Sequence, residues 1–316
     1  MIIKLGIIMD PISSINIKKD SSFAILLEAQ RRKYSIYYME LSDLYLKNDQ
    51  PFSKVKLLFL KNNKTKWFHF KKYEDISLIK LDIILMRKDP PVDENYIYAT
   101  YILEQAEKKG VLVVNKSQCL RDFNEKLLAM QFPQFIPQTL VTSDISKICN
   151  FIHKYKEIII KPLNGMGGFS IFRIHDTDSN KMVIIETMTK YGTKLCISQI
   201  YLPEIKSGDK RILIIHGKPF PWCLARIPKT NENRGNLASG GLGIVQKLSS
   251  YDWKIANYIA EFAKNKGLYL IGLDIIGKKL IEINITSPTC IQEIESKCRI
   301  SIRKIILDSI EKLLMK

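Results

Sequence analysis

Two features that would place this chain quickly are missing: a long apolar run and paired cysteines. Nothing in the 316 residues approaches the roughly 20 consecutive apolar residues of a membrane-spanning helix. The apolar N-terminal stretch is interrupted by Lys4 and ends at Asp10-Pro11, which makes it a poor signal peptide and a good buried strand. The six cysteines form no C-x-x-C pair, and the four histidines lie apart from them. We therefore expect a soluble, reduced, cytoplasmic protein without a membrane segment or a structural zinc site.

Clustered positive charge is also missing, although the formal net charge is +17. The lysines are scattered, and no basic stretch carries the interleaved aromatic residues of a nucleic-acid-binding module. Such a charge suits either a nucleic-acid surface or a lysine-rich enzyme that acts on anions. We favour the enzyme and expect no nucleic-acid partner. A basic RNA-binding protein with a vestigial nucleotide site is the alternative from another class.

No low-complexity linker divides the chain, so the two or three structural units expected at this length should share interfaces. From residue 1 to about 120, strands alternate with helices, which predicts a doubly wound α/β domain with a mainly parallel sheet. The expected strands are 2–9, 34–39, 82–86 and 111–115, with helices after the Asp20 cap and at 95–108. Ligands of such sheets bind beyond the carboxyl ends of the strands, here Met9-Asp10 and Arg87 to Asp89, which can equally be ordinary polar strand exits.

The later part of the chain changes to hairpins, which predicts an α+β region. The expected pairs are 157–161 with 169–174, 211–216 with 219–226, and 270–276 with 280–286; helices are expected near 117–131, 144–155 and 251–266. Residues 228–243 are rich in Asn and Gly. A loop of that length in a compact enzyme is typical of a lid or a disordered segment.

Residues 270–286 predict a metal site. With Gly277 to Lys279 as the loop of the hairpin, Asp274 lies opposite Glu282, and Asn284 points to the same face beside an open space at Gly272. Adjacent carboxylates on an apolar sheet repel each other, and a cation removes the conflict. Oxygen ligands in small number suit magnesium, which completes its shell with waters and phosphates. A solvated strand face is the alternative, and a one-residue slip in register would turn Asp274 away.

The stretch Gly165-Met166-Gly167-Gly168 lies between two expected strands, the first of which ends at Lys161. No G-K-[ST] follows the glycines and no helix opens after them, so neither common nucleotide fingerprint fits. Glycines let backbone N–H groups approach phosphate oxygens, but a plain hairpin turn is also consistent with this sequence. Lys126 stands near a helix start that Asp122 and Glu125 are expected to cap; it is either a phosphate ligand or an ordinary exposed residue.

The hairpin at 209–226 brings charged residues together. With Gly217-Lys218 as a two-residue turn, Asp209, Arg211 and Arg226 fall on one face. They can form a structural ion pair or, beside a magnesium site, hold an anionic intermediate.

Together these features resemble the ATP-grasp superfamily of carboxylate–amine ligases. Five longer stretches are similar to the bacterial type of glutathione synthetase, over residues from about 2 to 310: "MDPI…INIKKDSSFA…LLEAQRR", "LMRKDPP…YIYATYILE", "KPLNGMGGFSIFR", "CLARIP…RGNLASGG" and "GLDIIG…EINITSPTCIQEIE". The resemblance implies an ATP-dependent ligase that joins γ-glutamylcysteine to glycine through an acyl phosphate, with Mg²⁺ or Mn²⁺, in a homo-oligomer that is a tetramer by analogy. It further implies an α/β pre-ATP-grasp domain at 1–121, a small ATP-grasp subdomain at 122–202, and a large one at 203–316 with a mobile loop at 227–242.

The resemblance also implies roles for single residues. Those expected to contact ATP are Lys126, Lys161, Asn164, Gly165, Met166, Gly167, Gly168, Gln199, Ile200, Tyr201, Leu202 and Asp209. Those expected to bind the metal are Asp274, Glu282 and Asn284, and those at the reacting centre are Arg211, Arg226 and Arg234. The dipeptide is expected near Met9, Asp10, Arg87, Ser287, Pro288 and Thr289.

The mobile loop departs from the family pattern. In the family this loop commonly reads RGNLAAGGRG, whereas this chain has Leu242 in place of the second arginine. A basic residue therefore cannot help to close the loop at position 242, but Arg234 is present. The alternative within enzymes is another ATP-grasp ligase, one that joins D-alanines or adds glutamate to a protein terminus. Such a ligase shares the metal strand and the glycine loop, but not the stretches at 9–23 and 86–91.

Overall fold

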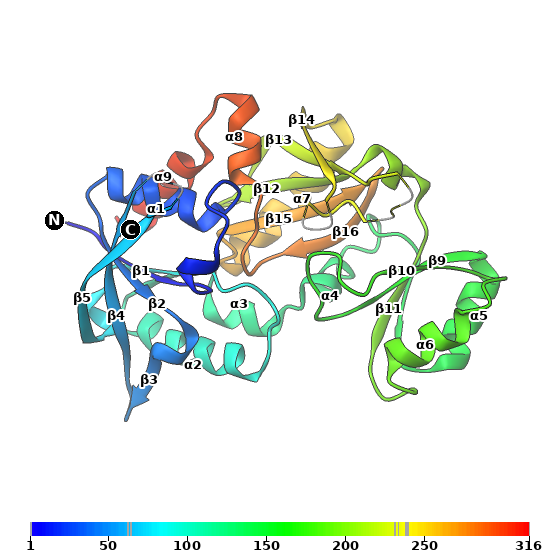
Figure 1. Cartoon of the computed structure of the whole chain (residues 1–316), viewed down its shortest axis with the longest axis horizontal. Helices are drawn as coiled ribbons and strands as arrows, with labels where there is room; N and C mark the ends of the chain where they lie inside the picture. The colour runs from blue at the N-terminus through cyan, green and yellow to red at the C-terminus, as the bar shows by residue number, and fades with distance from the viewer. Residues whose placement is uncertain are drawn as a thin grey trace.

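The computed structural model describes residues 2–61, 63, 65–230, 232, 234–237 and 240–315. Within these residues the strands form three sheets, and each sheet is the centre of one structural unit (Figure 1). None of the helices in this described part is long and apolar enough to cross a membrane. All six cysteines are free.

The N-terminal unit contains the expected parallel sheet. Strand β1 pairs in parallel with β2 and β6, and β6 pairs in parallel with β7. The strands are β1 (Lys4–Ile8), β2 (Ser35–Met39), β3 (Leu44–Lys47), β4 (Gln50–Leu60), β5 (Phe68–Ser77), β6 (Ile83–Met86) and β7 (Leu112–Val114). The helices are α1 (Ser21–Arg31), α2 (Glu94–Lys108) and α3 (Ser117–Asp122). The Asp20 carboxylate caps α1 by accepting from the N–H of Phe23, as predicted.

The long hairpin β4–β5 was not predicted. Strand β4 pairs antiparallel with β2, β3 and β5, so half of the N-terminal sheet is antiparallel. Its buried residues alternate with less buried ones, for example Val55 between Lys54 and Lys56, which is the pattern of a strand with one buried face.

The second unit is small and has a hydrophobic core of its own. Its four strands are β8 (Thr139–Thr142), β9 (Glu157–Pro162), β10 (Phe172–His175) and β11 (Cys196–Ile200), covered by α5 (Ile145–Tyr155) and α6 (Lys181–Thr189). The core contains Ile148, Ile152, Ile158, Ile160 and Ile185. We call this unit the lid unit; Figure 1 shows it standing apart from the other two.

The third unit is built on an antiparallel sheet in the order β14-β13-β12-β15-β16. Its strands are β12 (Asp209–Ile215), β13 (Lys218–Ile227), β14 (Leu242–Lys247), β15 (Leu270–Ile276) and β16 (Lys279–Asn284). Its helices are α7 (Ser250–Lys266), α8 (Ile291–Cys298) and α9 (Ile302–Leu314). Because β14 begins at Leu242, the loop expected to run to residue 243 is shorter than predicted.

Two hairpin turns differ by one residue from the prediction, and an irregularity in each ladder compensates. Ile276 pairs with Lys279, so the turn is Gly277-Lys278, and a bulge after Asp274 restores the predicted pairing of Asp274 with Glu282. In the β12–β13 hairpin Ile215 pairs with Lys218, so the turn is His216-Gly217, and a second register shift keeps Asp209 opposite Arg226.

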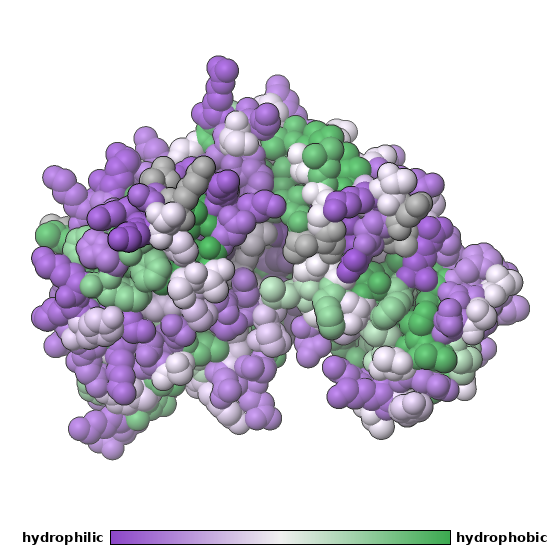
Figure 2. Space-filling model, in the orientation of Figure 1, coloured by the Kyte–Doolittle hydropathy of each residue, from purple (hydrophilic) through white to green (hydrophobic). Residues whose placement is uncertain are grey.

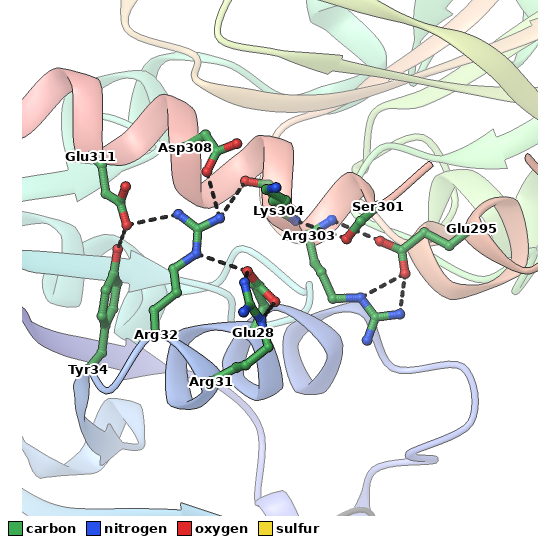
Figure 3. Close-up of polar contacts among 10 residues, drawn as sticks. All are labelled: Glu28, Arg31, Arg32, Tyr34, Glu295, Ser301, Arg303, Lys304, Asp308 and Glu311. Carbon is green, nitrogen blue, oxygen red and sulfur yellow. Dashed lines mark hydrogen bonds and ion pairs between the residues drawn. The ribbon is translucent and has the colours of Figure 1, made fainter. Parts of the chain in front are cut away.

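The first and third units share their cores. Two hydrophobic clusters each contain buried residues from both sheets, such as Ile84 with Ile271 and Leu85 with Leu213. Charged groups join the two units as well (Figure 3). The Arg32 guanidinium contacts Glu28 on its own helix and Asp308 and Glu311 on α9, at 2.6 to 2.9 Å. These contacts fix the C-terminal helix against the N-terminal unit.

Candidate active site

A cleft of about 660 Å³ lies where the three units meet. Figure 2 shows the surface hollowed between the lid unit and the rest of the molecule. Most of the predicted site residues line the cleft: Lys126, Lys161, Gly165, Met166, Gly167, Gly168, Gln199, Ile200, Tyr201, Leu202, Asp209, Arg211, Arg226, Arg234, Asp274, Glu282, Asn284, Ser287 and Thr289. Five predicted residues are not among its lining residues: Met9, Asp10, Arg87, Asn164 and Pro288. Of these, Met9 belongs to the hydrophobic core.

The floor of the cleft is a buried ion-pair network on β12, β13 and β15. Arg211 is the cross-strand neighbour of Asp274 and donates to both of its carboxylate oxygens, Nε to Oδ1 at 2.6 Å and Nη2 to Oδ2 at 3.0 Å. Arg226 contacts Asp274 Oδ2 at 3.0 Å and also donates to the Asp209 carboxylate. The Nη1 atom of Arg211 donates to Thr289 Oγ1 at 3.3 Å. All charged members of this network except Asp209 are fully buried, so their charges are held with little screening by solvent.

The network keeps Asp274 ionised. Burial alone would raise the pKa of this carboxyl, but Arg211 and Arg226 outweigh burial and hold the pKa well below its usual range. Asp209 shifts the other way, because burial raises its pKa more than Arg226 lowers it. Its Oδ1 is buried without a hydrogen-bond partner in the described structure. The two aspartates therefore have different proton affinities although both contact Arg226.

Lys126 reaches the cleft from a short helix, α4 (Glu125–Ala129). The single helix expected at 117–131 is in fact two, α3 and α4, which break at Phe123-Asn124. Asn124 caps α4, since its Oδ1 accepts from the N–H groups of Lys126 and Leu127, each at 3.1 Å. The cap expected from Asp122 and Glu125 is therefore wrong, while the position of Lys126 in the first turn is confirmed.

Lys126 connects two of the predicted features. Its Nζ donates to the backbone oxygen of Gly165 at 2.7 Å and to Glu282 Oε1 at 3.2 Å. The glycine loop is thus held over the carboxylate of β16 by one ammonium group. Residues 163–171 connect β9 to β10, which is longer than a tight hairpin turn, and Gly167 and Gly168 have φ of +63° and +84°, where glycine is favoured.

Lys161 is a second buried ammonium group, on β9. Burial lowers its pKa to about 8, and Lys126 adds to that shift while Glu282 opposes it. Because water solvates this ammonium group poorly, an anion that enters the cleft stabilises its charged form.

The predicted metal ligands lie together at the β15–β16 edge. Asp274 and Glu282 are cross-strand neighbours, and the Asn284 amide nitrogen donates to Gly272 O at 3.3 Å, which leaves its Oδ1 for another partner. The space at Gly272 that the sequence suggested to be open is filled by Arg211, because a Cβ on Gly272 would lie 2.9 Å from Arg211 Cδ. An ionised carboxylate, a second carboxylate and an amide oxygen fit a hard cation that keeps other ligands. No cluster of three or more His, Cys, Asp or Glu residues that could enclose a metal occurs in the described residues.

Arg87 is buried and does not line the cleft. Its Nε donates to Ser22 Oγ and its Nη2 to Pro288 O, both at 3.0 Å, while Nη1 is buried without a partner in the described structure. The neighbouring Asp89 joins the segments predicted for the dipeptide, because its carboxylate accepts from Ser287 and its N–H donates to Asp10.

The loop after β13 also contacts the glycine loop. Arg234 is paired with Glu232, and its Nη1 donates to the backbone oxygen of Gly168 at 3.3 Å. Leu242 is 64% exposed and pairs with Ile227 as the first residue of β14. Four residues of the predicted mobile loop 227–242 lie outside the described residues: Asn231, Asn233, Ala238 and Ser239.

Comparison with known proteins decides between the ATP-grasp ligases. The model of the prokaryotic glutathione synthetase N-terminal domain matches residues 3–121, and that of the prokaryotic glutathione synthetase ATP-grasp domain matches residues 125–299. The chain belongs to the prokaryotic glutathione synthetases. It is therefore an ATP-dependent ligase of glutathione synthesis.

Full-length relatives agree with this family. A glutathione synthetase of Buchnera aphidicola subsp. Baizongia pistaciae (strain Bp) is 65% identical over 317 residues, which cover 100% of this chain and 98% of the relative. The glutathione synthetase of Escherichia coli (strain K12) is 56% identical over 309 residues, 98% of each chain.

Solved structures support the fold. D-cycloserine synthetase DcsG matches with a TM-score of 0.66 at 12% identity over 98% of this chain and 99% of its own. The ATP-grasp ligase PsnB, complexed with minimal precursor, Mg and ADP, matches with a TM-score of 0.63 at 12% identity over 99% and 98%.

One residue of the chain has a place in the cleft that sequence reasoning missed. Glu125 is not a helix cap; its Oε1 accepts from the N–H of Ile285 at 2.8 Å and from the N–H and hydroxyl of Thr286 at 3.0 and 2.9 Å. These bonds fix α4, which carries Lys126, to the end of β16, which carries Asn284. The only sequence signal is an acidic residue beside Lys126, which the capping explanation had already accounted for.

Proposed function

We propose that this ligase joins γ-glutamylcysteine to glycine in two steps. The cysteinyl carboxylate of the dipeptide attacks the γ-phosphorus of ATP, the bond to the β,γ-bridging oxygen breaks, and ADP and an acyl phosphate form. The glycine amine then attacks the acyl carbon and loses a proton, and the tetrahedral adduct expels phosphate. The row of charges formed by Arg211, Asp274, Glu282 and Lys126 supports this proposal most strongly, because it offers a nucleotide both cations and metal ligands in one cleft.

The nucleotide would lie between the lid unit and the third unit. Lys126, Lys161 and the loop from Asn164 to Gly168 would contact its phosphates, while Gln199 to Leu202 would hold the adenine. The unpaired Oδ1 of Asp209 suits a hydroxyl donor such as the ribose. We expect a phosphate to compete with Glu282 for Lys126, since both are anions within reach of the same ammonium group.

Asp274, Glu282 and Asn284 would hold Mg²⁺, or Mn²⁺, whose chemistry is to neutralise charge on the transferring phosphoryl group. For that role Glu282 would have to leave its ion pair with Lys126. Arg211 and Arg226 keep Asp274 ionised, so its oxygens accept and do not donate.

The arginines would also act on the reacting centre. Arg211 is expected to stabilise the oxyanion of the tetrahedral adduct, with Arg226 and Arg234 adding positive charge. Arg87, through its unpaired Nη1, and the segments at Met9-Asp10 and Ser287 to Thr289 would hold the dipeptide. Because water would hydrolyse an acyl phosphate, the loop 227–242 and the glycine loop would cover it during the reaction.

The wider setting belongs to the same proposal. We place the enzyme in the cytoplasm as a homo-oligomer, a tetramer by analogy with its family, without a nucleic-acid or membrane partner. We divide it into a substrate domain at 1–121, a small ATP-grasp subdomain at 122–202 and a large one at 203–316. The three separate sheets and the separate core of the lid unit support this division.

An ATP-dependent phosphate-release assay tests the substrates. We expect release with γ-glutamylcysteine plus glycine, and none above background when D-alanine replaces both. Release with D-alanine alone would contradict the proposed substrates and favour the other ATP-grasp reaction.

A further inference from the structure

Helix α2 packs one face against the N-terminal unit and turns the opposite face to solvent. Its buried residues are Tyr96, Ala99, Thr100, Leu103 and Ala106. At about 100° per residue these five cover one side of the helix, and the opposite side carries Glu94, Tyr98, Tyr101, Gln105 and Lys108. We call the second set the outer stripe. Figure 1 shows α2 at the lower surface of the N-terminal unit, and none of its residues lines the cleft.

The centre of the outer stripe is aromatic, which is typical of protein–protein interfaces. Tyr98 is 58% exposed and Tyr101 is 49% exposed, and they lie one turn apart in the middle of the helix. The Tyr101 ring is already held in position, because the Arg121 guanidinium lies over it at 4.3 Å and also pairs with Glu104 at 2.8 Å. A side chain that is fixed in advance loses little conformational freedom when a partner covers it.

The two ends of the outer stripe carry opposite charges. Glu94 and Lys108 are both exposed, and each lies seven residues from Tyr101. Within the described part of the chain Glu94 forms no ion pair, and Lys108 forms a long one, with Glu104 at 3.7 Å. The outer stripe is therefore complementary to itself. When a second α2 is laid antiparallel with Tyr101 at the centre, each Glu94 lies at the level of a Lys108.

The spacing of the outer stripe suits contact along its whole length. Its residues are separated alternately by four and by three positions, which is the repeat that keeps two helices in contact along one seam at a shallow crossing angle. From Glu94 to Lys108 the helix rises about 21 Å at about 1.5 Å per residue, so such a seam includes both charged ends. Antiparallel packing also brings the oppositely charged ends of the two helix dipoles together.

Other placements of the second helix lose the charge match. With the centre at Tyr98, the level of Lys108 falls at residue 88, before the partner helix begins, and with the centre at Gln105, the level of Glu94 falls at residue 116, after it ends. A parallel arrangement in register places like charges together at both ends. The equal distances of the acid and the base from the central tyrosine match a partner that presents the same stripe, so the geometry favours a second copy of this chain.

We propose that the outer stripe of α2 packs antiparallel against the outer stripe of a second copy of this chain, about a twofold axis at Tyr101. Such a contact is isologous, since each residue meets a position that the partner also supplies. The two Tyr101 rings meet on the axis, each Tyr98 lies beside a Gln105 of the other copy, and two ion pairs between Glu94 and Lys108 close the ends. The proposal names a surface for the homo-oligomer proposed above and does not depend on the ligase chemistry.

Charge variants of the stripe ends test this contact by sedimentation velocity of the full chain over a dilution series. Glu94→Lys and Lys108→Glu each place like charges together at both ends of the seam. Two exposed ion pairs then become two repulsions, which should raise the dissociation constant of this contact about tenfold. A variant that carries both substitutions again places acid beside base, so its dissociation constant should return to the wild-type value.

A tyrosine variant tests the centre of the contact. Tyr98→Asp with Tyr101→Asp removes the aromatic rings and brings four carboxylates together at the axis, so the molar mass of the assembly should fall twofold. Tyr191→Asp is the matched control, because Tyr191 is 79% exposed on the lid unit, and it should keep the wild-type mass. Circular dichroism of each variant reports whether it is folded. Phosphate release from the same samples reports the ligase activity separately, because α2 lies outside the cleft.

A wild-type chain that is monomeric at all concentrations would overturn the proposal. So would folded single charge variants with the wild-type dissociation constant, or a doubly substituted charge variant that associates as weakly as the single ones. A folded tyrosine variant that keeps the wild-type mass would overturn it as well.

Discussion

Replacing Arg211 by alanine tests the reacting centre most sharply. The proposed reaction passes through a tetrahedral oxyanion, and removing a single donor to such an oxyanion costs about 3 kcal/mol in comparable sites. At 1.36 kcal/mol per factor of ten, this predicts a kcat about 10²-fold lower. Arg211 contacts Asp274 and Thr289 in the cleft wall, while the phosphates are assigned to Lys126 and Lys161, so the affinity for ATP should change little.

A second effect of Arg211→Ala follows from its bidentate bond to Asp274. Burial raises the pKa of this carboxyl, and Arg211 is the largest single influence that lowers it. Without the guanidinium the pKa rises, so the acid limb of the pH–activity profile should move to higher pH.

The assay measures phosphate release under saturating ATP, γ-glutamylcysteine and glycine, with ATP affinity from a separate binding titration. Arg211→Lys keeps the charge but not the bidentate geometry, so its kcat should be intermediate. Arg303→Ala is the matched control, because Arg303 pairs with Glu295 away from the cleft (Figure 3). A kcat for Arg211→Ala within threefold of wild type, with an unmoved acid limb, would refute this reasoning.

Three further predictions concern other parts of the cleft. Burial lowers the pKa of Lys161 to about 8, so the side chain is charged below pH 8 and loses its proton as the pH rises through 8. The value of kcat/KM for ATP should therefore fall above pH 8, and Lys161→Arg should move that fall to higher pH. A pH profile that does not move in this variant would show that Lys161 takes no part in nucleotide binding. Glu125→Ala leaves the N–H groups of Ile285 and Thr286 without their acceptor, which should lower the free energy of unfolding by about 2 kcal/mol and kcat roughly tenfold. Glu125→Gln keeps an acceptor oxygen at this position, so it should retain most of the stability and most of the kcat. Equal losses in the two variants would show that these hydrogen bonds are not the cause. Proteolytic cleavage within 228–243 should raise ATP hydrolysis that is not coupled to peptide formation, and a cleaved enzyme that stays fully coupled would contradict the covering role of this loop.

The parts of the fold that follow local rules were predictable. The Asp20 cap, the four parallel strands and the pairing of Asp274 with Glu282 all rest on short-range patterns of polarity and turn residues. The predicted turn at Gly277 was one residue too long, yet the predicted pairing was right because a bulge shifts the register by one residue. Strand β5 was missed because none of its residues is buried and half of them are exposed, so its hydrophobic alternation is weak.

The contacts within the cleft join residues that lie far apart in the sequence, and no local pattern predicts such contacts. Lys126 and Glu282 are 156 positions apart, and the bond between them exists only because α4 packs against β16. Glu125 shows the same limit, since its residue type suited a helix cap and its actual partners lie 160 positions away. The family resemblance named part of the cleft lining but not Glu125 or Thr286, and the mutual contacts of the lining residues required the structure.

Isotope transfer from the dipeptide to phosphate tests the central claim most directly. γ-Glutamylcysteine labelled with ¹⁸O in its cysteinyl carboxylate is incubated with the enzyme, ATP and glycine, and the released phosphate is analysed by mass spectrometry. If the carboxylate attacks the γ-phosphorus and the acyl phosphate is then cleaved at its acyl carbon, each phosphate carries one carboxylate oxygen. We predict ¹⁸O in the phosphate in a one-to-one ratio with the glutathione formed. Phosphate without ¹⁸O, released together with glutathione, would contradict the acyl-phosphate route.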